Sequence, residues 1–103
     1  MDHRAGDVMH ARVLTIQMRP EEIEEVVQRY RELIVPSAKA QPGFKGLMLL
    51  TDAATGLAHS ITFWDEAEQG WDQEEYRKLL GEFNNTMTVQ SFARKGFEVR
   101  VRV

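Results

Sequence analysis

The sequence contains no cysteine. This excludes disulfide bonds, thiolate catalysis, and metal or iron-sulfur sites held by cysteine. It also contains no apolar run close to the roughly 20 residues that a membrane-spanning helix needs. The N-terminal segment, MDHRAGDVMH, is polar and lacks the apolar core of a secretory signal peptide. We therefore expect a cytoplasmic protein without a membrane partner, in which residues 1–8 form a loose tail.

An excess of positive charge is missing as well. The chain has 13 Lys and Arg against 16 Asp and Glu residues, for a formal net charge of −3. Proteins that bind DNA or RNA usually carry a basic stripe, so we expect no nucleic-acid partner. His3 and His10 lie too near the tail, and too far from other ligands, to indicate a metal site. With 103 residues, 43% of them hydrophobic, the chain is predicted to form one domain over residues 9–103.

Hydrophobic periodicity predicts the outer elements of the domain. Alternating apolar residues indicate a first strand over residues 9–18 and a final strand over 97–103. Pro20, followed by several glutamates, is typical of a helix start. The apolar stripe of this helix consists of Ile23, Val26, Val27, Tyr30, Leu33 and Ile34. Pro36 is expected to bend or interrupt the helix, because it lacks a backbone donor, and residues 37–41 are either a last helical piece or a loop.

Two apolar runs within residues 41–65 flank a linker of turn-forming residues, and this pattern predicts a β-hairpin. The first run, 44–50, is apolar on both faces. One face is predicted to hold Phe44, Met48 and Leu50, and the other to hold Leu47 and Leu49. A chain of this size has helices enough for only one face of a sheet. A second copy of the chain is therefore expected to cover the other face.

The segment after the hairpin offers two places for a second helix to begin. Asp65 and Asp72 are each followed, three residues later, by a glutamate, which is the spacing of a helix cap. The first pair predicts a helix that starts directly behind Trp64 and is kinked near Gly70. The second pair predicts a later start. Residues 87–93 are either an extended arm leading into the last strand or a short extra strand paired with it.

The resulting order is strand, helix, strand, strand, helix, strand. This is the βαββαβ order of a ferredoxin-like α+β domain, in which two helices cover one face of a four-stranded antiparallel sheet. Burying an apolar side chain of the uncovered face contributes roughly 1.5 to 3 kcal/mol. We therefore expect sheet-to-sheet dimerisation into a dimeric α+β barrel.

Several motifs occur together along residues 9–103. They are a proline after the first strand, a long acidic-to-basic first helix, Gln41-Pro42-Gly43-Phe44, Ser60-Ile61-Thr62-Phe63-Trp64, and the helix start Asp65-Glu66-Ala67-Glu68. In this combination the chain resembles the antibiotic-biosynthesis-monooxygenase-like group of dimeric α+β barrels. The resemblance implies a cleft between the sheet and the helices of each subunit. Members of the group include cofactor-independent oxygenases of polycyclic phenols and quinones, haem-degrading enzymes and many proteins without a known role.

The resemblance also implies which residues line the cleft. It turns the Trp64 face of the third strand, which carries Ser60 and Thr62, towards the helices, where Trp71 and Tyr76 would form a wall. We therefore expect a homodimeric, cofactor-free monooxygenase that binds a small aromatic, phenol- or quinone-like compound at these residues. No two titratable side chains have clear acid-base spacing, so no catalytic residue is assigned. The alternative is a non-catalytic small-molecule-binding or regulatory protein.

The remaining histidine, His59, is not expected to lie in the cleft. His59 lies on the opposite face of the third strand, where a lone histidine is more typical of a hydrogen-bonded interface residue than of a base.

Haem-degrading members use an asparagine on the first strand and a histidine on the second helix. These positions fall near Val13 and near Glu74 or Glu75, and a carboxylate is an unusual haem ligand. Haem degradation is therefore the least favoured alternative.

Overall fold

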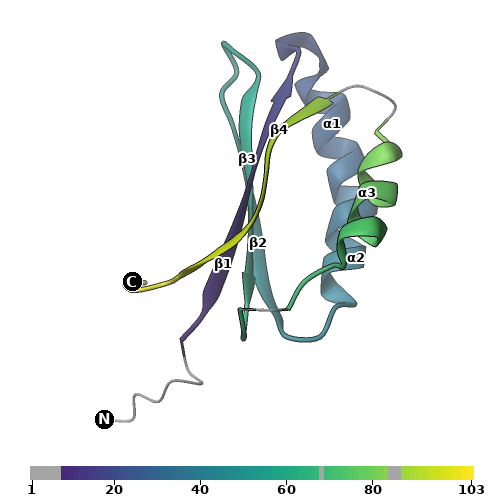
Figure 1. Cartoon of the computed structure of the whole chain (residues 1–103). Helices are drawn as coiled ribbons and strands as arrows, with labels where there is room; N and C mark the ends of the chain where they lie inside the picture. Colours follow the sequence, from purple (N-terminus) through teal and green to yellow (C-terminus); the bar gives the residue numbers. More distant parts are fainter. Residues whose placement is uncertain (1–7, 68, 84–86) are drawn as a thin grey trace.

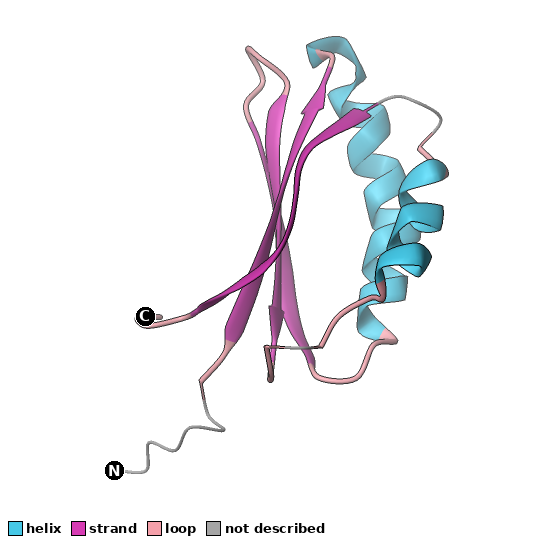
Figure 2. Ribbon diagram, viewed as in Figure 1, coloured by secondary structure: helices cyan, strands magenta, loops and turns pink. Residues whose placement is uncertain are grey.

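The computed structural model describes residues 8–67, 69–83 and 87–103 of the chain. Its sheet has the strand order β2-β3-β1-β4, and all neighbouring strands are antiparallel. The helices lie on one face of the sheet, and in the described part of the chain no helix covers the other (Figure 1, Figure 2). The elements are β1 (His10–Met18), a 3₁₀ turn (Pro20–Glu22), α1 (Ile23–Arg29), a π-helical turn (Tyr30–Ile34), α2 (Val35–Lys39), β2 (Phe44–Thr51), β3 (Leu57–Trp64), α3 (Gln73–Gly81) and β4 (Met87–Glu98).

This arrangement confirms the predicted ferredoxin-like α+β fold. Except for Val8, the predicted N-terminal tail lies outside the described residues. Among the described helices, none is long and apolar enough to span a membrane.

The hydrophobic core lies between the sheet and the helices. β1 directs Leu14, Ile16 and Met18 into it, and all three are buried. β3 pairs with β1 in register, with Ser60 opposite Leu14 and Ala58 opposite Ile16, so these side chains share the covered face. The helical side of the core consists of Ile23, Val26, Tyr30, Ile34, Ala38 and Phe83.

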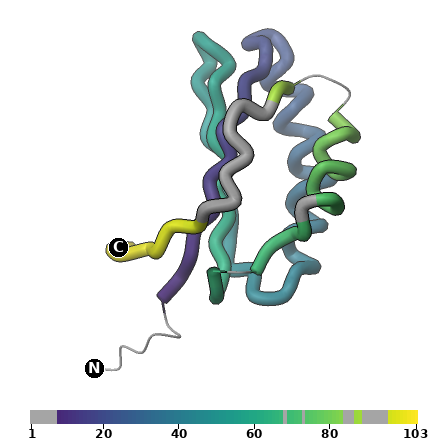
Figure 3. The backbone as a smooth tube through the Cα atoms, in the orientation of Figure 1, coloured from purple at the N-terminus to yellow at the C-terminus, as the bar shows by residue number. Residues whose placement is uncertain are grey.

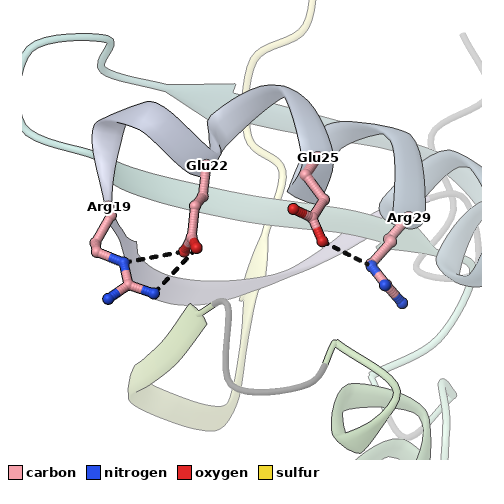
Figure 4. A network of polar contacts seen from close by, with 4 residues as sticks. All are labelled: Arg19, Glu22, Glu25 and Arg29. Carbon is pink, nitrogen blue, oxygen red and sulfur yellow. Dashed lines mark hydrogen bonds and ion pairs between the residues drawn. The ribbon is translucent and has the colours of Figure 1, made fainter.

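Exposed ion pairs lie along the outer side of the first helix. Arg19 donates to the Glu22 carboxylate at 3.1 and 3.0 Å, and Arg29 lies 3.5 Å from the Glu25 carboxylate (Figure 4). Such surface ion pairs contribute little to the free energy of folding. Arg29 also donates to the backbone carbonyl of Glu82 at 3.1 Å, which ties α1 to the end of α3.

The first helix continues past Pro36. α1 leads into the π-helical turn Tyr30–Ile34, where the Val35 N–H donates to the Tyr30 carbonyl five residues back. α2 then extends to Lys39, so residues 37–39 are the last helical piece, one of the two predicted alternatives. The predicted interruption at Pro36 is thus a change of helical geometry just before the proline.

The face assignment of Phe44 was wrong. A register shift between Phe44 and Gly46 inserts an extra residue into β2, and Phe44 lies opposite Trp64 on the helix-facing side. Beyond this bulge the prediction holds. Leu47 and Leu49 pack against the core, while Met48 and Leu50 are exposed on the other face.

The helix start at Asp65 was also wrong, and the later one was right. The Asp72 carboxylate accepts from the Glu74 and Glu75 N–H groups at 2.8 and 3.3 Å, and α3 begins at Gln73. Gly70 explains the delay, since its φ of 124° is incompatible with a helix.

The final strand lies earlier in the chain than predicted. β4 pairs with the whole of β1, from Met87 opposite Met18 to Glu98 opposite His10, with two register shifts. β1 begins at His10, so the regular pairing of β4 ends opposite this residue. One hydrogen bond follows, in which the Val99 N–H donates to the Met9 carbonyl at 2.8 Å. Residues 99–103, predicted as strand, therefore have no regular structure. They leave the sheet on the side away from the helices (Figure 3).

The hairpin turn depends on Gly56. This residue has a φ of 78°, and a Cβ at this position would collide with the Met18 carbonyl oxygen. We expect Gly56→Ala to lower the free energy of unfolding by at least about 2 kcal/mol, because a left-handed conformation costs alanine about 1 to 2 kcal/mol before the collision is counted. Urea denaturation measures this loss.

Gly81 provides the matched control. It ends α3, and an added Cβ meets nothing within 4 Å. Gly81→Ala is expected to be neutral or to stabilise by up to about 1 kcal/mol, since alanine is the better helix former. Equal effects of the two substitutions would contradict the turn geometry.

Candidate functional site

The floor of the candidate site is the helix-facing side of β3. Ser60, Thr62 and Trp64 all lie there, as predicted, with exposed fractions of 2%, 5% and 0%. The Trp64 indole donates to the Thr62 hydroxyl at 2.9 Å. A fully buried indole N–H is thus satisfied within its own strand.

An aromatic wall stands over this floor. Trp71 precedes α3 and packs edge-on against Trp64, with ring centroids 5.7 Å apart, and it stacks on Tyr76 at 4.6 Å and 10°. Phe44 also packs edge-on against Trp64, with ring centroids 5.6 Å apart. The structure therefore brings all five predicted ligand-binding residues into one aromatic and hydroxyl group, hereafter the cluster: Ser60, Thr62, Trp64, Trp71 and Tyr76.

The long first helix contributes two polar contacts that the sequence interpretation missed. The Tyr30 hydroxyl lies 2.7 Å from the Ser60 Oγ, and both residues are buried. Ser37 accepts from the Trp71 indole at 2.7 Å. Tyr30 was assigned to the apolar stripe, where it does lie. One signal in the sequence could have indicated the contact with Ser60: Tyr30 places a hydroxyl in a stripe that faces the strand hydroxyls of Ser60 and Thr62.

Burial changes the acidity of both tyrosines. It raises the pKa of Tyr30, and a hydrogen bond with Ser60 offsets part of this effect. Burial also raises the pKa of Tyr76, with a further increase from the charge interaction with Tyr30 and a partial offset from Ser60. Both phenols stay protonated at neutral pH. They are suited to donate a hydrogen bond and unsuited to act as bases.

The two tyrosines provide a direct test, because they are the only ones in the chain. We expect the near-ultraviolet absorbance of tyrosinate to appear at higher pH in the folded protein than in the chain unfolded by urea, whose tyrosines titrate near pH 10. Because the folded pKa values of Tyr30 and Tyr76 are raised, their contribution to stability is complete below about pH 10 and is lost as pH rises through the folded values. Coincident titration of both states would contradict the burial of the cluster.

His59 lies outside the cluster. It is on the face of β3 that points away from the helices, and its Nδ1 lies 3.2 Å from the Thr15 Oγ1 on β1. The histidine therefore has a hydrogen-bond partner on an apolar strand face, where the sequence placed it. It does not reach Ser60, Thr62 or Trp64.

Two cavities lined by described residues lie away from the cluster. One of about 370 Å³ lies between the start of the first helix and the hairpin tip, and includes Arg19 and Thr55. The other, of about 270 Å³, lies beside the C-terminal segment and includes Phe63 and Val101. Within the described residues, no three His, Asp or Glu side chains are grouped closely enough to hold a metal ion.

Comparison with family models identifies the class of protein to which this fold and cluster belong. Residues 9–78 match the antibiotic biosynthesis monooxygenase family. The match covers more than half of the 103 residues and includes every residue of the cluster. The chain belongs to the antibiotic biosynthesis monooxygenase family.

Two curated relatives come from Mycobacterium tuberculosis: uncharacterized protein MT2634 of strain CDC 1551 / Oshkosh and uncharacterized protein Rv2557 of strain ATCC 25618 / H37Rv. Each is 29% identical to this chain over 65 residues, which are 63% of this chain and 29% of the relative. The matched part thus spans less than a third of the length of these relatives.

A solved structure shows the same fold at low identity. MupZ from Pseudomonas fluorescens superposes with a TM-score of 0.58 at 10% identity, covering 87% of this chain and 68% of MupZ. This similarity bears on the fold alone. SnoaB, a cofactor-independent oxygenase from Streptomyces nogalater, gives a TM-score of 0.42 at 19% identity over 93% of both chains, too weak a superposition to bear on this chain.

Proposed function

We propose that this protein is a cofactor-independent monooxygenase that binds a small aromatic, phenol- or quinone-like compound at the cluster. The observation that carries the proposal is the grouping of indole, phenol and hydroxyl groups between the sheet and the helices of a member of the monooxygenase family. Flat rings favour a flat ligand, and the few polar atoms among them orient it.

The paired polar atoms define what a ligand must offer. Within the described residues, no buried side-chain nitrogen or oxygen lacks a hydrogen-bond partner. A ligand that separates Trp71 from Ser37, or Tyr30 from Ser60, must replace the lost bond, because an unsatisfied buried group costs roughly 1 to 3 kcal/mol. The indole N–H only donates, so the ligand must present an oxygen acceptor to it.

The chemistry then falls largely to the ligand. An anthrone-type phenolate, which carries an activated CH₂ group, reacts with dioxygen once it is bound and shielded from water: one oxygen atom replaces the two hydrogens of the CH₂ group as a carbonyl, and the other leaves with those hydrogens as water. Tyr30 and Tyr76, whose pKa values are raised, donate hydrogen bonds to the ligand oxygen and do not deprotonate it. The rate should therefore follow the acidity of the ligand itself.

We further propose that the protein works as a homodimer. The side of the sheet away from the helices, hereafter the outer face, carries a largely apolar set of side chains: Ala11, Val13, Thr15, Met48, Leu50, Leu57, His59, Ile61, Phe63 and Phe97. Met48, Leu50 and Phe97 are about half exposed. A second copy packed on this face would remove them from water.

Oxygen uptake with anthrone-like and hydroquinone compounds tests the activity. We expect protein-dependent uptake that falls strongly in Trp71→Phe, which removes the indole donor proposed to face the ligand and keeps an aromatic ring. Thr51→Ser is the control, because Thr51 is exposed at the end of β2, outside both the cluster and the outer face, and the change should leave the rate unchanged. No uptake above the protein-free rate with any compound would refute the enzyme proposal.

The alternative is a binding or regulatory protein without turnover. It is favoured by one observation, namely that neither Tyr76 of the cluster nor its neighbour Tyr30 is a base at neutral pH. A ligand that raises the melting temperature and is recovered unchanged would support it. Haem degradation has less support: Val13 lies on the outer face, and Glu74 and Glu75 are exposed, so none of them is placed to hold a haem at the cluster.

A further inference from the structure

We propose that Pro36 is a positioning residue of the candidate site, because it holds the π-helical turn that lets Tyr30 and Ser37 reach the cluster from one helix. The proposal rests on the proposed function only for its effect on a ligand. The positioning itself follows from the geometry of the helix and is measured without one.

The spacing of the buried residues requires the π-helical turn. The helix buries Val26, Tyr30, Ile34 and Ala38, with exposed fractions of 1%, 5%, 1% and 0%. This is a repeat of four, whereas side chains of an α-helix rotate by about 100° per residue, so Val26 and Ala38 would point about 120° apart in a regular α-helix. A π turn contains one additional residue, which takes up about 100° of this drift. Both ends of the stripe therefore face the core.

Pro36 explains why the wider turn lies where it does. In an α-helix, residue 36 would donate its N–H to the Glu32 carbonyl, but proline has no N–H, and its ring crowds that carbonyl. The π-helical turn ends at Ile34, two residues before the proline, and closes with the Val35 N–H donating to the Tyr30 carbonyl. Widening the turn relieves the crowding, and the helix then resumes as α2.

The polar contacts of the helix lie on either side of this turn. At its start, the Tyr30 hydroxyl lies 2.7 Å from the Ser60 Oγ. Just beyond it, the Ser37 Oγ accepts from the Trp71 indole at 2.7 Å. Without the additional residue, the side chains of Tyr30 and Ser37 could not both point towards their partners, Ser60 and Trp71. One proline thus sets the position of the helix against the floor and the wall of the cluster.

The Trp71 indole N–H reports on the turn. In ¹⁵N-labelled protein the chain gives two indole signals, from its two tryptophans, and Trp64→Phe and Trp71→Phe assign them. We expect Pro36→Ala to shift the Trp71 signal to the position that it has in Ser37→Ala, where the acceptor is removed directly. Pro42→Ala, at an exposed turn, is the matched control and should leave the signal in place. An unchanged Trp71 signal in folded Pro36→Ala would overturn the proposal.

A deletion provides the complementary test, including the case in which Pro36→Ala fails to fold. Arg31 is exposed within the π-helical turn, and removing it from Pro36→Ala leaves an uninterrupted α-helix in which Val26 and Ala38 point only about 20° apart. We expect this double variant to fold and to restore the wild-type Trp71 signal, whereas the deletion alone, with Pro36 kept, should not. Failure of the double variant to restore the signal would refute the proposal, whatever the outcome of the oxygen-uptake assay. If the proposed function holds, ligand affinity should fall in Pro36→Ala and recover in the double variant.

Discussion

Replacing Trp64 with alanine is expected to lower the free energy of unfolding by about 3 to 5 kcal/mol. The side chain is fully buried, and its ring packs edge-on against those of Phe44 and Trp71. Removal leaves a cavity between the sheet and the helices and deprives the Thr62 hydroxyl of its indole donor. Since the free energy of unfolding of small domains is only about 5 to 15 kcal/mol, this single change should remove a large fraction of it. Urea denaturation followed by circular dichroism measures the loss without relying on tryptophan fluorescence.

Phe97→Ala is the matched control for this loss. Phe97 is also aromatic and also lies on a strand, but 49% of it is exposed. Because Phe97 lies on the outer face, both variants are compared in a Leu50→Asp background, in which the proposed dimer is separated. There the truncation of Phe97 should cost less than about 1 kcal/mol, because little apolar surface leaves the interior. A Trp64→Ala variant as stable as Phe97→Ala would mean that helices and sheet do not pack around Trp64.

Much of the fold could be predicted because its elements are strongly periodic. Alternation predicted β1 and the hairpin, and the apolar stripe predicted the first helix. The face of β3 that meets the helices followed from the resemblance to the family, and the burial of Ser60, Thr62 and Trp64 agrees with it. These are properties of local pattern, which a single sequence displays directly.

The errors arose where structure depends on distant residues. The alternating valines after Phe97 resemble a strand, but β4 ends opposite the end of its neighbour β1. The residues of β4 alone do not show where β1 ends. The capping pattern at Asp65 is real, yet the backbone of Gly70 is incompatible with a helix there. Phe44 changed faces because of a bulge that alternation alone does not show.

For the candidate site, the placement of the residues on their elements was predictable and their contacts were not. The strand hydroxyls and the aromatic wall could be placed on elements, but the partners of Ser60 and Trp71 come from the first helix, through Tyr30 and Ser37. A four-residue repeat before Pro36 was present in the sequence. It becomes informative only once the helix is known to continue past the proline.

Introducing a charge on the outer face should separate the proposed dimer. We expect wild-type protein to sediment with twice the mass of one 11.9 kDa chain. Leu50→Asp should weaken the dimer at least about a hundredfold, which corresponds to about 2.8 kcal/mol. The change acts twice in a symmetric dimer, and each copy replaces a buried apolar contact with an unpaired carboxylate. The monomer should tolerate it, because Leu50 is 48% exposed there.

Thr51 separates an effect of the interface from an effect of charge. It is the next residue of β2, is exposed, and lies on the face of the sheet that carries the helices, opposite Ala58. Thr51→Asp adds the same charge to the same strand and should leave the dimer intact. Equal weakening by both variants would point to general repulsion in a chain that is already negative. A wild-type mass of one chain at all concentrations would refute the dimer, and the apolar outer face would then need a different partner.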